Sequence, residues 1–220
     1  MRILMMTNTY TPHVGGVARS VSSFEQQLRN MGHEVMVVAP EYEEMPEEEE
    51  NVIRLPAIQN FNGSDFSVSI PIPGHLANSL NKFQPEIVHT HHPFLVGSTA
   101  MRISMKYEIP IVFTYHTMYE RYTHYIPVDF KALKQFVVNL SVGYANMCDL
   151  VIAPTKSISE LLIERQVKTP IEIVPTGVDL EFFKKDKGKF REKHGIRKDA
   201  FVFGCVNRLA HEKNFDFLAR

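Results

Sequence analysis

The sequence predicts an α/β protein built on a doubly wound, mostly parallel β-sheet. Short apolar segments alternate along the chain with longer segments whose apolar residues recur every three or four positions, as in amphipathic helices. This alternation is typical of parallel sheets covered by helices on both faces. In addition, the unusual polar and glycine clusters each follow a predicted strand, and such sheets bind ligands at the carboxyl ends of their strands.

The first half of the chain contains four predicted strands, at 2–7, 34–39, 52–55 and 87–90. After the first strand, apolar residues at helical spacing predict a helix that Gly32 ends. The apolar stripe of this helix consists of Val17, Val21, Phe24, Leu28 and Met31. An irregular segment to about residue 74 and a short helix then lead to the fourth strand.

The second half continues the same pattern, with strands predicted at 111–113, 150–153, 171–174 and 200–206. Apolar periodicity predicts helices at about 95–106 and 129–147. A further helix is indicated by Ser157 and Glu160, which have the spacing of a capping box. A last helix is expected to begin near Asn214.

The pattern predicts three parts of the chain. Residues 1–180 form an α/β domain, and the basic stretch within 181–199 forms a linker. Residues 200–220 supply one strand and the start of one helix, which cannot bury their own apolar surface. We therefore expect 200–220 to be the truncated start of a second α/β domain.

Composition allows a sizeable core and does not point to nucleic acid. Hydrophobic residues make up 44% of the 220 residues, and the formal charge is −1. Seven glutamates lie within residues 41–50; elsewhere 24 basic residues face 18 acidic ones, a net charge of +6. We therefore expect basic faces that attract an anionic ligand or an anionic membrane surface, and no nucleic-acid partner.

Cysteine usage and hydropathy predict a cytoplasmic protein. Cys148 and Cys205 lie far apart and have no metal or redox spacing, as expected of thiols in a reducing compartment. The apolar residues 3–6 are too few for a signal peptide. Since no stretch reaches the ~18 apolar residues of a membrane span, we expect any lipid contact to be peripheral, at the inner face of the cell membrane.

Residues 110–126 pass from a buried strand into a cluster of aromatic and charged side chains. Burying so many polar-tipped aromatics without partners is costly, so we expect them to line a cleft. His116 directly follows the strand, and a neutral imidazole there can hydrogen-bond a substrate hydroxyl and the group leaving from it. Its position between Tyr115 and the group 119–121 strengthens this candidate.

Gly15 and Gly16 stand between the first strand and the first helix. Two glycines at a helix N-terminus let a phosphate reach backbone N–H groups at the positive end of the helix dipole. The spacing fits neither G-x-G-x-x-G nor the P-loop, and glycine is also an ordinary turn residue. The residues alone leave a phosphate site and a plain turn both open.

Two further clusters have competing interpretations. His89, His91 and His92 suggest metal ligands, but adjacent residues at a strand end point in opposite directions. We therefore expect no metal; we expect one or two of these histidines to line the cleft, and His89, within the strand, to be a core histidine. Arg208 and Lys213 follow the last predicted strand and can clamp a diphosphate, but taken alone they are better explained as part of an exposed basic loop.

Taken together, these motifs resemble glycosyltransferase family four, whose members have the two-domain GT-B fold. The resemblance covers the chain, from PHVGGVARSV at 12–21, through IVPTGVDLEFF at 173–183, to RLAHEKN at 208–214. The segments HTHHPFLVG at 89–97 and TYHTMYERYTHYI at 114–126 look most like the diacylglycerol glucosyltransferases of the family. The resemblance implies that residues 1–180 are Rossmann-like and form the acceptor-side, N-terminal half of a GT-B fold. It also implies that residues 200–220 begin the domain that binds the nucleotide sugar.

The resemblance also implies a function: a retaining, metal-independent hexosyltransferase without a cofactor. A hexose would move from a nucleotide-diphosphate sugar to a lipid acceptor of the diacylglycerol type. Gly15, Gly16, Arg208 and Lys213 would bind the donor, and His116 would be the catalytic residue that contacts the donor sugar and the leaving phosphate. The candidates for the acceptor side are His13, His91, His92, Tyr119, Glu120 and Arg121.

The same resemblance places the glutamates that bind the donor sugar in the second domain, beyond residue 220. We therefore expect the 220 residues alone to be inactive. Two alternatives stay open at this stage: the same reaction with a soluble acceptor, such as a sugar phosphate or small glycoside, and a non-catalytic binding module.

Overall fold

The computed structural model describes residues 1–46, 49–59, 67–70, 76–121, 131–178, 180–184, 189–207 and 213–219. These residues divide into two compact units, Met1–Gly177 and Val178–Arg220. Every strand that the structure describes belongs to the first unit.

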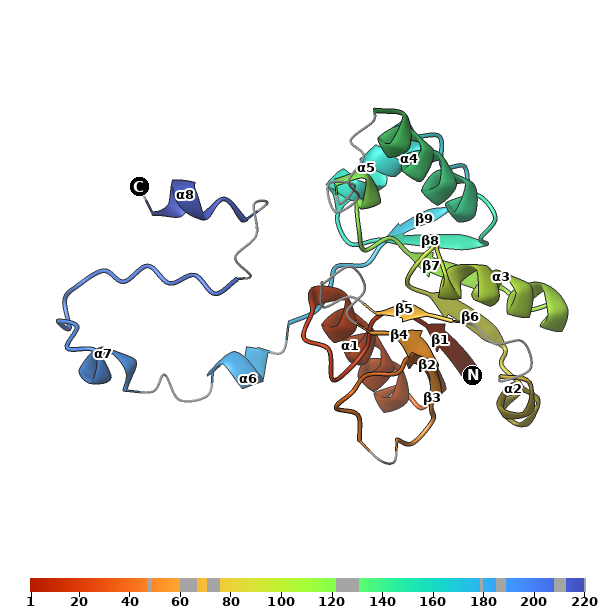
Figure 1. Ribbon diagram of the computed structural model, residues 1–220, viewed down its shortest axis with the longest axis horizontal. Coiled ribbons are helices and arrows are strands. Elements are labelled where there is room, and N and C mark those ends of the chain that lie inside the picture. The colour runs from red at the N-terminus through yellow and green to blue at the C-terminus, as the bar shows by residue number, and fades with distance from the viewer. Residues whose placement is uncertain are drawn as a thin grey trace. The chain divides into compact units, whose positions relative to one another are not determined.

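A seven-stranded parallel sheet organises the first unit (Figure 1). The strand order is β3-β2-β1-β6-β7-β8-β9, and each neighbouring pair is parallel. The strands are β1 (Arg2–Met6), β2 (Glu34–Pro40), β3 (Val52–Leu55), β6 (Ile87–Thr90), β7 (Ile111–Thr114), β8 (Leu150–Ala153) and β9 (Ile171–Ile173). The predicted doubly wound, Rossmann-like sheet is confirmed.

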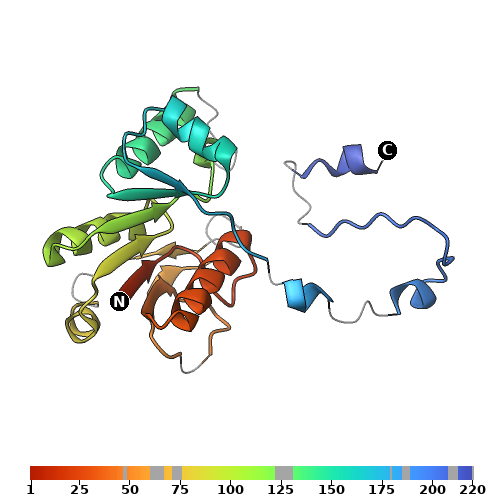
Figure 2. The same cartoon turned by 180° about the vertical axis from the view of Figure 1, so that it is seen from behind.

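Two hydrophobic cores cover the two faces of the sheet. Side chains alternate along β1, so that Leu4 and Met6 enter one core and Ile3 and Met5 enter the other. Helix α1 (Gly16–Asn30) packs on the Ile3 side, and Figures 1 and 2 show it on the opposite side of the sheet from α2 and α3. The helices of the Leu4 side are α2 (Ala77–Phe83), α3 (Val96–Tyr107), α4 (Lys131–Ala145) and α5 (Lys156–Glu164).

The order of the strands reverses between β1 and β6. From β1 the chain continues to β2 and β3 on one side, whereas β6 to β9 lie on the other side. Met6 and Thr90, the last residues of β1 and β6, are register partners in the sheet. The loops that leave these two strands therefore separate at a topological switch point, where doubly wound sheets bind ligands.

The cap of α5 differs from the prediction. Thr155 has an extended backbone (φ −150°, ψ 160°), and its hydroxyl accepts a hydrogen bond from the Ile158 N–H at 3.3 Å. Ser157 lies inside the helix, so the predicted capping box of Ser157 with Glu160 is wrong. A cap residue has a non-helical backbone, whereas Ser157 is already the second residue of the helix.

A small antiparallel pair of strands occupies part of the segment that we expected to be irregular. β4 (Ala57–Ile58) pairs with β5 (Val68–Ser69), and Ala57 lies opposite Ser69. The backbone N–H of Ile70 also donates to the carbonyl of Pro56 at 2.7 Å. Such short strands carry too little periodicity to be recognised from the sequence.

The described residues of the second unit include three short helices, α6 (Leu180–Lys184), α7 (Phe190–Lys193) and α8 (Phe215–Leu218). The predicted strand at 200–206 is not formed, and this correction has a physical reason. A strand needs neighbouring strands to pair with, and Phe201, Phe203 and Val206 are 88%, 77% and 99% exposed. The helix expected near Asn214 is confirmed as α8, while the division into domain, linker and second domain stays a prediction.

Candidate functional site

Asn8 joins the loop after β1 to the loop after β6 by hydrogen bonds. Its side-chain amide donates to the carbonyl of Phe94 at 3.1 Å, and its side-chain oxygen accepts from the N–H of Val96 at 3.3 Å. Its backbone N–H donates to Nδ1 of His92 at 3.1 Å. Our sequence reasoning missed Asn8, although a polar residue directly after the first buried strand was a usable signal.

A stack of three histidines lies beside the switch point. His89 and His91 have ring centroids 4.1 Å apart, and His91 and His116 have centroids 5.2 Å apart. Nδ1 of His91 and Nε2 of His116 share a hydrogen bond at 2.9 Å, and Nε2 of His89 bonds the Thr114 hydroxyl at 2.7 Å. The strand order therefore brings the ends of β6 and β7 into one hydrogen-bonded cluster.

Burial keeps these imidazoles neutral at neutral pH. It lowers the pKa of His89 to about 3 and that of His116 to about 4, and it lowers the pKa of His91 well below its usual value. His116 is partly exposed, whereas His89 and His91 are buried. The neutral imidazole expected at position 116 therefore agrees with its surroundings.

His91 and His92 point to different partners, as the alternation of a strand requires. His91 joins the stack, and His92 contacts Asn8 and, at 3.4 Å, the Thr7 hydroxyl. Both side chains are buried, and the pKa of His92 is lowered by burial to about 3. Their predicted contact with the acceptor stays a prediction.

Across the described ranges, no group of three or more His, Cys, Asp or Glu side chains is arranged to hold a metal ion.

The diglycine forms the start of α1. Gly15 is the N-cap with an extended backbone, Gly16 is the first helical residue, and no described side chain caps this end. A Cβ at Gly15 would lie 2.9 Å from Nε2 of His13, whereas a Cβ at Gly16 would meet nothing within 4 Å. The first-turn N–H groups at the positive end of the helix dipole are therefore suited to an anionic oxygen.

Arg54, on β3, holds the loop that precedes the diglycine. Its guanidinium donates to the carbonyl of Thr11 at 2.7 Å and forms an ion pair with Glu49 at 2.6 Å. His13, which we predicted on the acceptor side, stacks on Tyr42 with ring centroids 6.0 Å apart. Nothing in the sequence singled out Arg54, because its partners lie on three separate segments.

The residues after β7 are only partly described. Tyr119, Glu120 and Arg121 form a short 3₁₀ helix, and the rest of the predicted cleft edge, 122–126, lies outside the described residues. The Glu120 carboxylate accepts from the Arg165 guanidinium at 2.7 Å, and Tyr119 packs edge-on against Phe94. The Glu120–Arg165 pair anchors this turn to the end of α5, and the acceptor roles of residues 119–121 stay predictions.

Of the two predicted diphosphate ligands, Arg208 lies outside the described residues. Lys213 is described and belongs to the second unit, just before α8. The donor-binding roles of both residues stay predictions.

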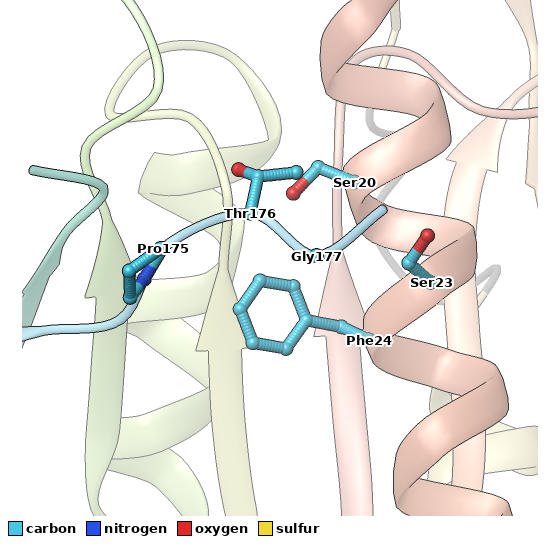
Figure 3. Close-up of a pocket in the computed structure, with 6 residues that line it drawn as sticks. All are labelled: Ser20, Ser23, Phe24, Pro175, Thr176 and Gly177. Atoms are coloured by element: carbon cyan, nitrogen blue, oxygen red, sulfur yellow. The ribbon is translucent and has the colours of Figure 1, made fainter. Parts of the chain in front are cut away.

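A small pocket that the sequence did not predict lies between α1 and the loop after β9 (Figure 3). Its volume is about 90 Å³, and it is lined by Ser20, Ser23, Phe24, Pro175, Thr176 and Gly177. Ligand pockets typically measure roughly 300–1,000 Å³, so this one can hold only part of a ligand. The Phe24 ring also contacts the rings of His89 and His91, which connects the pocket to the histidine stack.

A parallel sheet with a glycine-led helix and a neutral histidine stack at its carboxyl edge defines a Rossmann-like domain. Residues 14–182 match the sequence profile of Glycosyltransferase Family 4. The chain belongs to that family.

Individual relatives agree with this assignment. An alpha-monoglucosyldiacylglycerol synthase of Streptococcus pneumoniae is 30% identical over 97% of this chain and 50% of its own length. A synthase of the same name from Acholeplasma laidlawii is 31% identical over 97% of this chain and 57% of its own length. The chain thus spans about half the length of the curated relatives it matches.

Solved structures share the fold. HepE of Anabaena, solved with UDP-glucose, superposes with a TM-score of 0.65 at 16% identity over 99% of this chain and 56% of its own. A sucrose-phosphate synthase of Thermosynechococcus elongatus gives a TM-score of 0.64 at 17% identity, over 90% of this chain and 53% of its own. Likeness at this level of identity concerns the fold alone.

Proposed function

We propose that this chain is the acceptor-side half of a retaining glycosyltransferase that moves a hexose from a nucleotide-diphosphate sugar to a diacylglycerol-type lipid. The observation that carries the proposal is the 30% and 31% identity to two alpha-monoglucosyldiacylglycerol synthases over nearly the whole chain. Because the chain spans about half of each, turnover is proposed to require a donor-binding domain in addition to these residues.

The donor site must carry the negative charge that builds up on the diphosphate as the glycosidic bond breaks. The uncapped start of α1 offers backbone N–H groups, and neutral His116 offers a ring N–H. Arg208 and Lys213 are proposed to add two fixed positive charges. Removing one such contact typically lowers the rate by ~10²-fold to 10³-fold.

Retention requires the acceptor to approach the face that the diphosphate leaves. The bond between the anomeric carbon and the diphosphate oxygen breaks with its electron pair, and the acceptor oxygen bonds to the same carbon. The acceptor proton passes to the leaving phosphate, which serves as the base. The atoms balance without a metal or a cofactor.

The lipid acceptor is supported by the surface of α4. Phe136 and Leu140 on this helix are 58% and 44% exposed, and Lys134 lies on the same helix. Exposed apolar side chains on a helix that also carries a lysine suit peripheral contact with an anionic membrane surface, proposed here as the inner face of the cell membrane. None of the helices in the described ranges is long and apolar enough to cross a bilayer.

The test uses two proteins: the 220-residue chain, and a longer protein in which this chain is followed by a family donor-binding domain, called here the two-domain enzyme. Each is given a panel of nucleotide sugars with anionic vesicles containing diacylglycerol, and the anomeric configuration of the product is read by NMR. We expect a glycolipid that retains the donor configuration, formed by the two-domain enzyme alone. An inverted product contradicts retention, and turnover by the 220 residues contradicts the need for a second domain.

The same assay separates the acceptors. Transfer to a sugar phosphate or a small glycoside, with none to diacylglycerol and no sedimentation with anionic vesicles, would replace the lipid by a soluble acceptor. If the two-domain enzyme neither hydrolyses nor transfers the sugar of any donor, the result would favour a non-catalytic binding module.

A further inference from the structure

His91 has two ring nitrogens in contrasting surroundings. Nδ1 shares a hydrogen bond with Nε2 of His116 at 2.9 Å. Nε2 is buried and has no hydrogen-bond partner among the described residues. The ring is held between those of His89 and His116, and the His91 backbone N–H donates to the Met6 carbonyl at 2.9 Å, so the side chain is held in one place.

A neutral imidazole carries one proton, so the pair has two possible arrangements. In the first, His116 donates from Nε2 to His91 Nδ1, and the His91 proton lies on Nε2, where it has no acceptor. In the second, His91 donates from Nδ1, and its Nε2 holds only a lone pair. Buried N–H groups without an acceptor are rarer and costlier than buried acceptors without a donor, so the second arrangement is favoured.

We propose that His91 is a positioning residue that donates its Nδ1–H to Nε2 of His116 and thereby fixes the His116 proton on Nδ1. This inference rests on the proposed function, in which His116 faces the donor sugar and the leaving diphosphate. The hydrogen bond made by one ring nitrogen of a histidine sets the proton on the other. His116 then presents an N–H donor to an anionic phosphate oxygen, whereas a bare nitrogen at that position would repel it.

The placement of the two residues supports this role. His116 is partly exposed and His91 is fully buried, so a ligand can reach only the former. The histidines follow neighbouring parallel strands, β6 and β7, whose register pairs Thr90 with Phe113. The sheet itself therefore sets the distance between the two rings.

The first test reads the proton directly on the ¹⁵N-labelled 220-residue chain, without substrate. Two-bond ¹H–¹⁵N spectra at pH 7.5 distinguish protonated from bare ring nitrogens. We expect His116 to carry its proton on Nδ1 and His91 to carry its proton on Nδ1. A proton on Nε2 of His116 in the unmodified chain overturns the proposal.

Two variants of similar shape supply the matched comparison. His91→Asn places an amide N–H near the original Nδ1, so we expect His116 to keep its proton on Nδ1. His91→Leu removes the donor, so we expect the His116 proton to shift toward Nε2. His33→Asn, at the opposite edge of the sheet, controls for a general effect of losing a histidine. If His91→Leu does not fold, the spectra of the unmodified chain and of His91→Asn still show which nitrogen of His116 carries the proton.

Kinetics of the two-domain enzyme separate this inference from the proposed function. We expect His91→Leu to lower kcat at least ~10-fold with little change in the acceptor KM, and His91→Asn to restore most of the rate. If folded His91→Leu is fully active while His116→Ala has a lowered kcat, the positioning role of His91 is overturned and the role of His116 stands. Full activity of His116→Ala overturns the role of His116 in the proposed function, while the spectra still report on the histidine pair.

Discussion

Asn8 donates its backbone N–H to Nδ1 of His92 at 3.1 Å, and its side chain bonds two further backbone groups of the same loop. The end of β1 is thereby joined to the start of α3 across the switch point. The same loop carries His91, the middle member of the histidine stack.

The side chain of Asn8 is therefore expected to matter for stability. Asn8→Leu leaves the Val96 N–H without its partner and removes one of the two donors to the Phe94 carbonyl, which keeps the N–H of Gly97 at 3.2 Å. We expect a loss of about 1–3 kcal/mol in the free energy of unfolding. Urea denaturation of the 220-residue chain measures this loss. Asn30→Leu, at the exposed end of α1, is the surface control and should stay within about 0.5 kcal/mol of the unmodified chain.

The Arg54–Glu49 pair is expected to support the loop before the diglycine. Their side chains are only 10% and 16% exposed, so Arg54→Met leaves a buried carboxylate without its cation and should cost on the order of 3 kcal/mol. The double variant Arg54→Met/Glu49→Gln should recover part of that loss. Hydrogen exchange should show faster exchange at residues 11–16 in Arg54→Met, and an unchanged rate there would contradict the role of Arg54 in holding the loop.

Gly16 is expected to separate stability from activity. It is the first residue of α1, and a Cβ there meets nothing within 4 Å, so Gly16→Ala should fold well and gain up to about 1 kcal/mol of stability. The added methyl stands where the donor phosphate is proposed to approach, so kcat/KM of the two-domain enzyme should fall. Unchanged kcat/KM in this stable variant would remove Gly16 from the donor site.

His116 and Lys213 are expected to contribute to the transition state. In the two-domain enzyme, His116→Ala and Lys213→Ala should each lower kcat/KM by at least ~10², the usual effect of losing a contact to developing charge. Steady-state kinetics with the donor varied measures the effect, and His33→Ala serves as the remote control. Near-normal rates in both variants would remove this assignment of the donor site.

The histidines at the carboxyl edge are expected to make stability depend on pH. Burial lowers the pKa of His89 and His92 to about 3 and of His116 to about 4, whereas each titrates near ~6.5 when unfolded. Below that value the unfolded chain binds more protons, so stability is complete above about pH 6.5 and falls as the pH drops. Each such histidine adds a slope of up to about 1.4 kcal/mol per pH unit.

Urea denaturation at pH 7.5, 6.5 and 5.5 measures this dependence, and the interval lies above the range in which most carboxylates titrate. His116→Gln has one such histidine fewer and should show a shallower slope. Equal stability at pH 7.5 and 5.5 would show that these imidazoles are protonated in the folded state.

Much of the fold could be predicted because its signals are local. The strands at 87–90 and 150–153 were placed at their observed bounds, and Gly32 ends its helix with φ +84° as expected of a C′ glycine. The cap of α5 was misplaced because serine is, as a residue type, at least as good a cap as threonine, so that residue type alone does not select Thr155 over Ser157. The strand at 200–206 was wrong because its formation depends on neighbours that no local pattern supplies.

The sequence by itself determined the fold class, the family and a short set of candidate residues, since periodicity and motif order are properties of the chain. Only the tertiary structure decided which of those residues meet. His91 and His116, Asn8 and His92, and Glu120 and Arg165 are separated by 25, 84 and 45 positions. Contacts over such separations follow from the order and register of the strands, because the parallel sheet brings loops from distant parts of the chain to one edge.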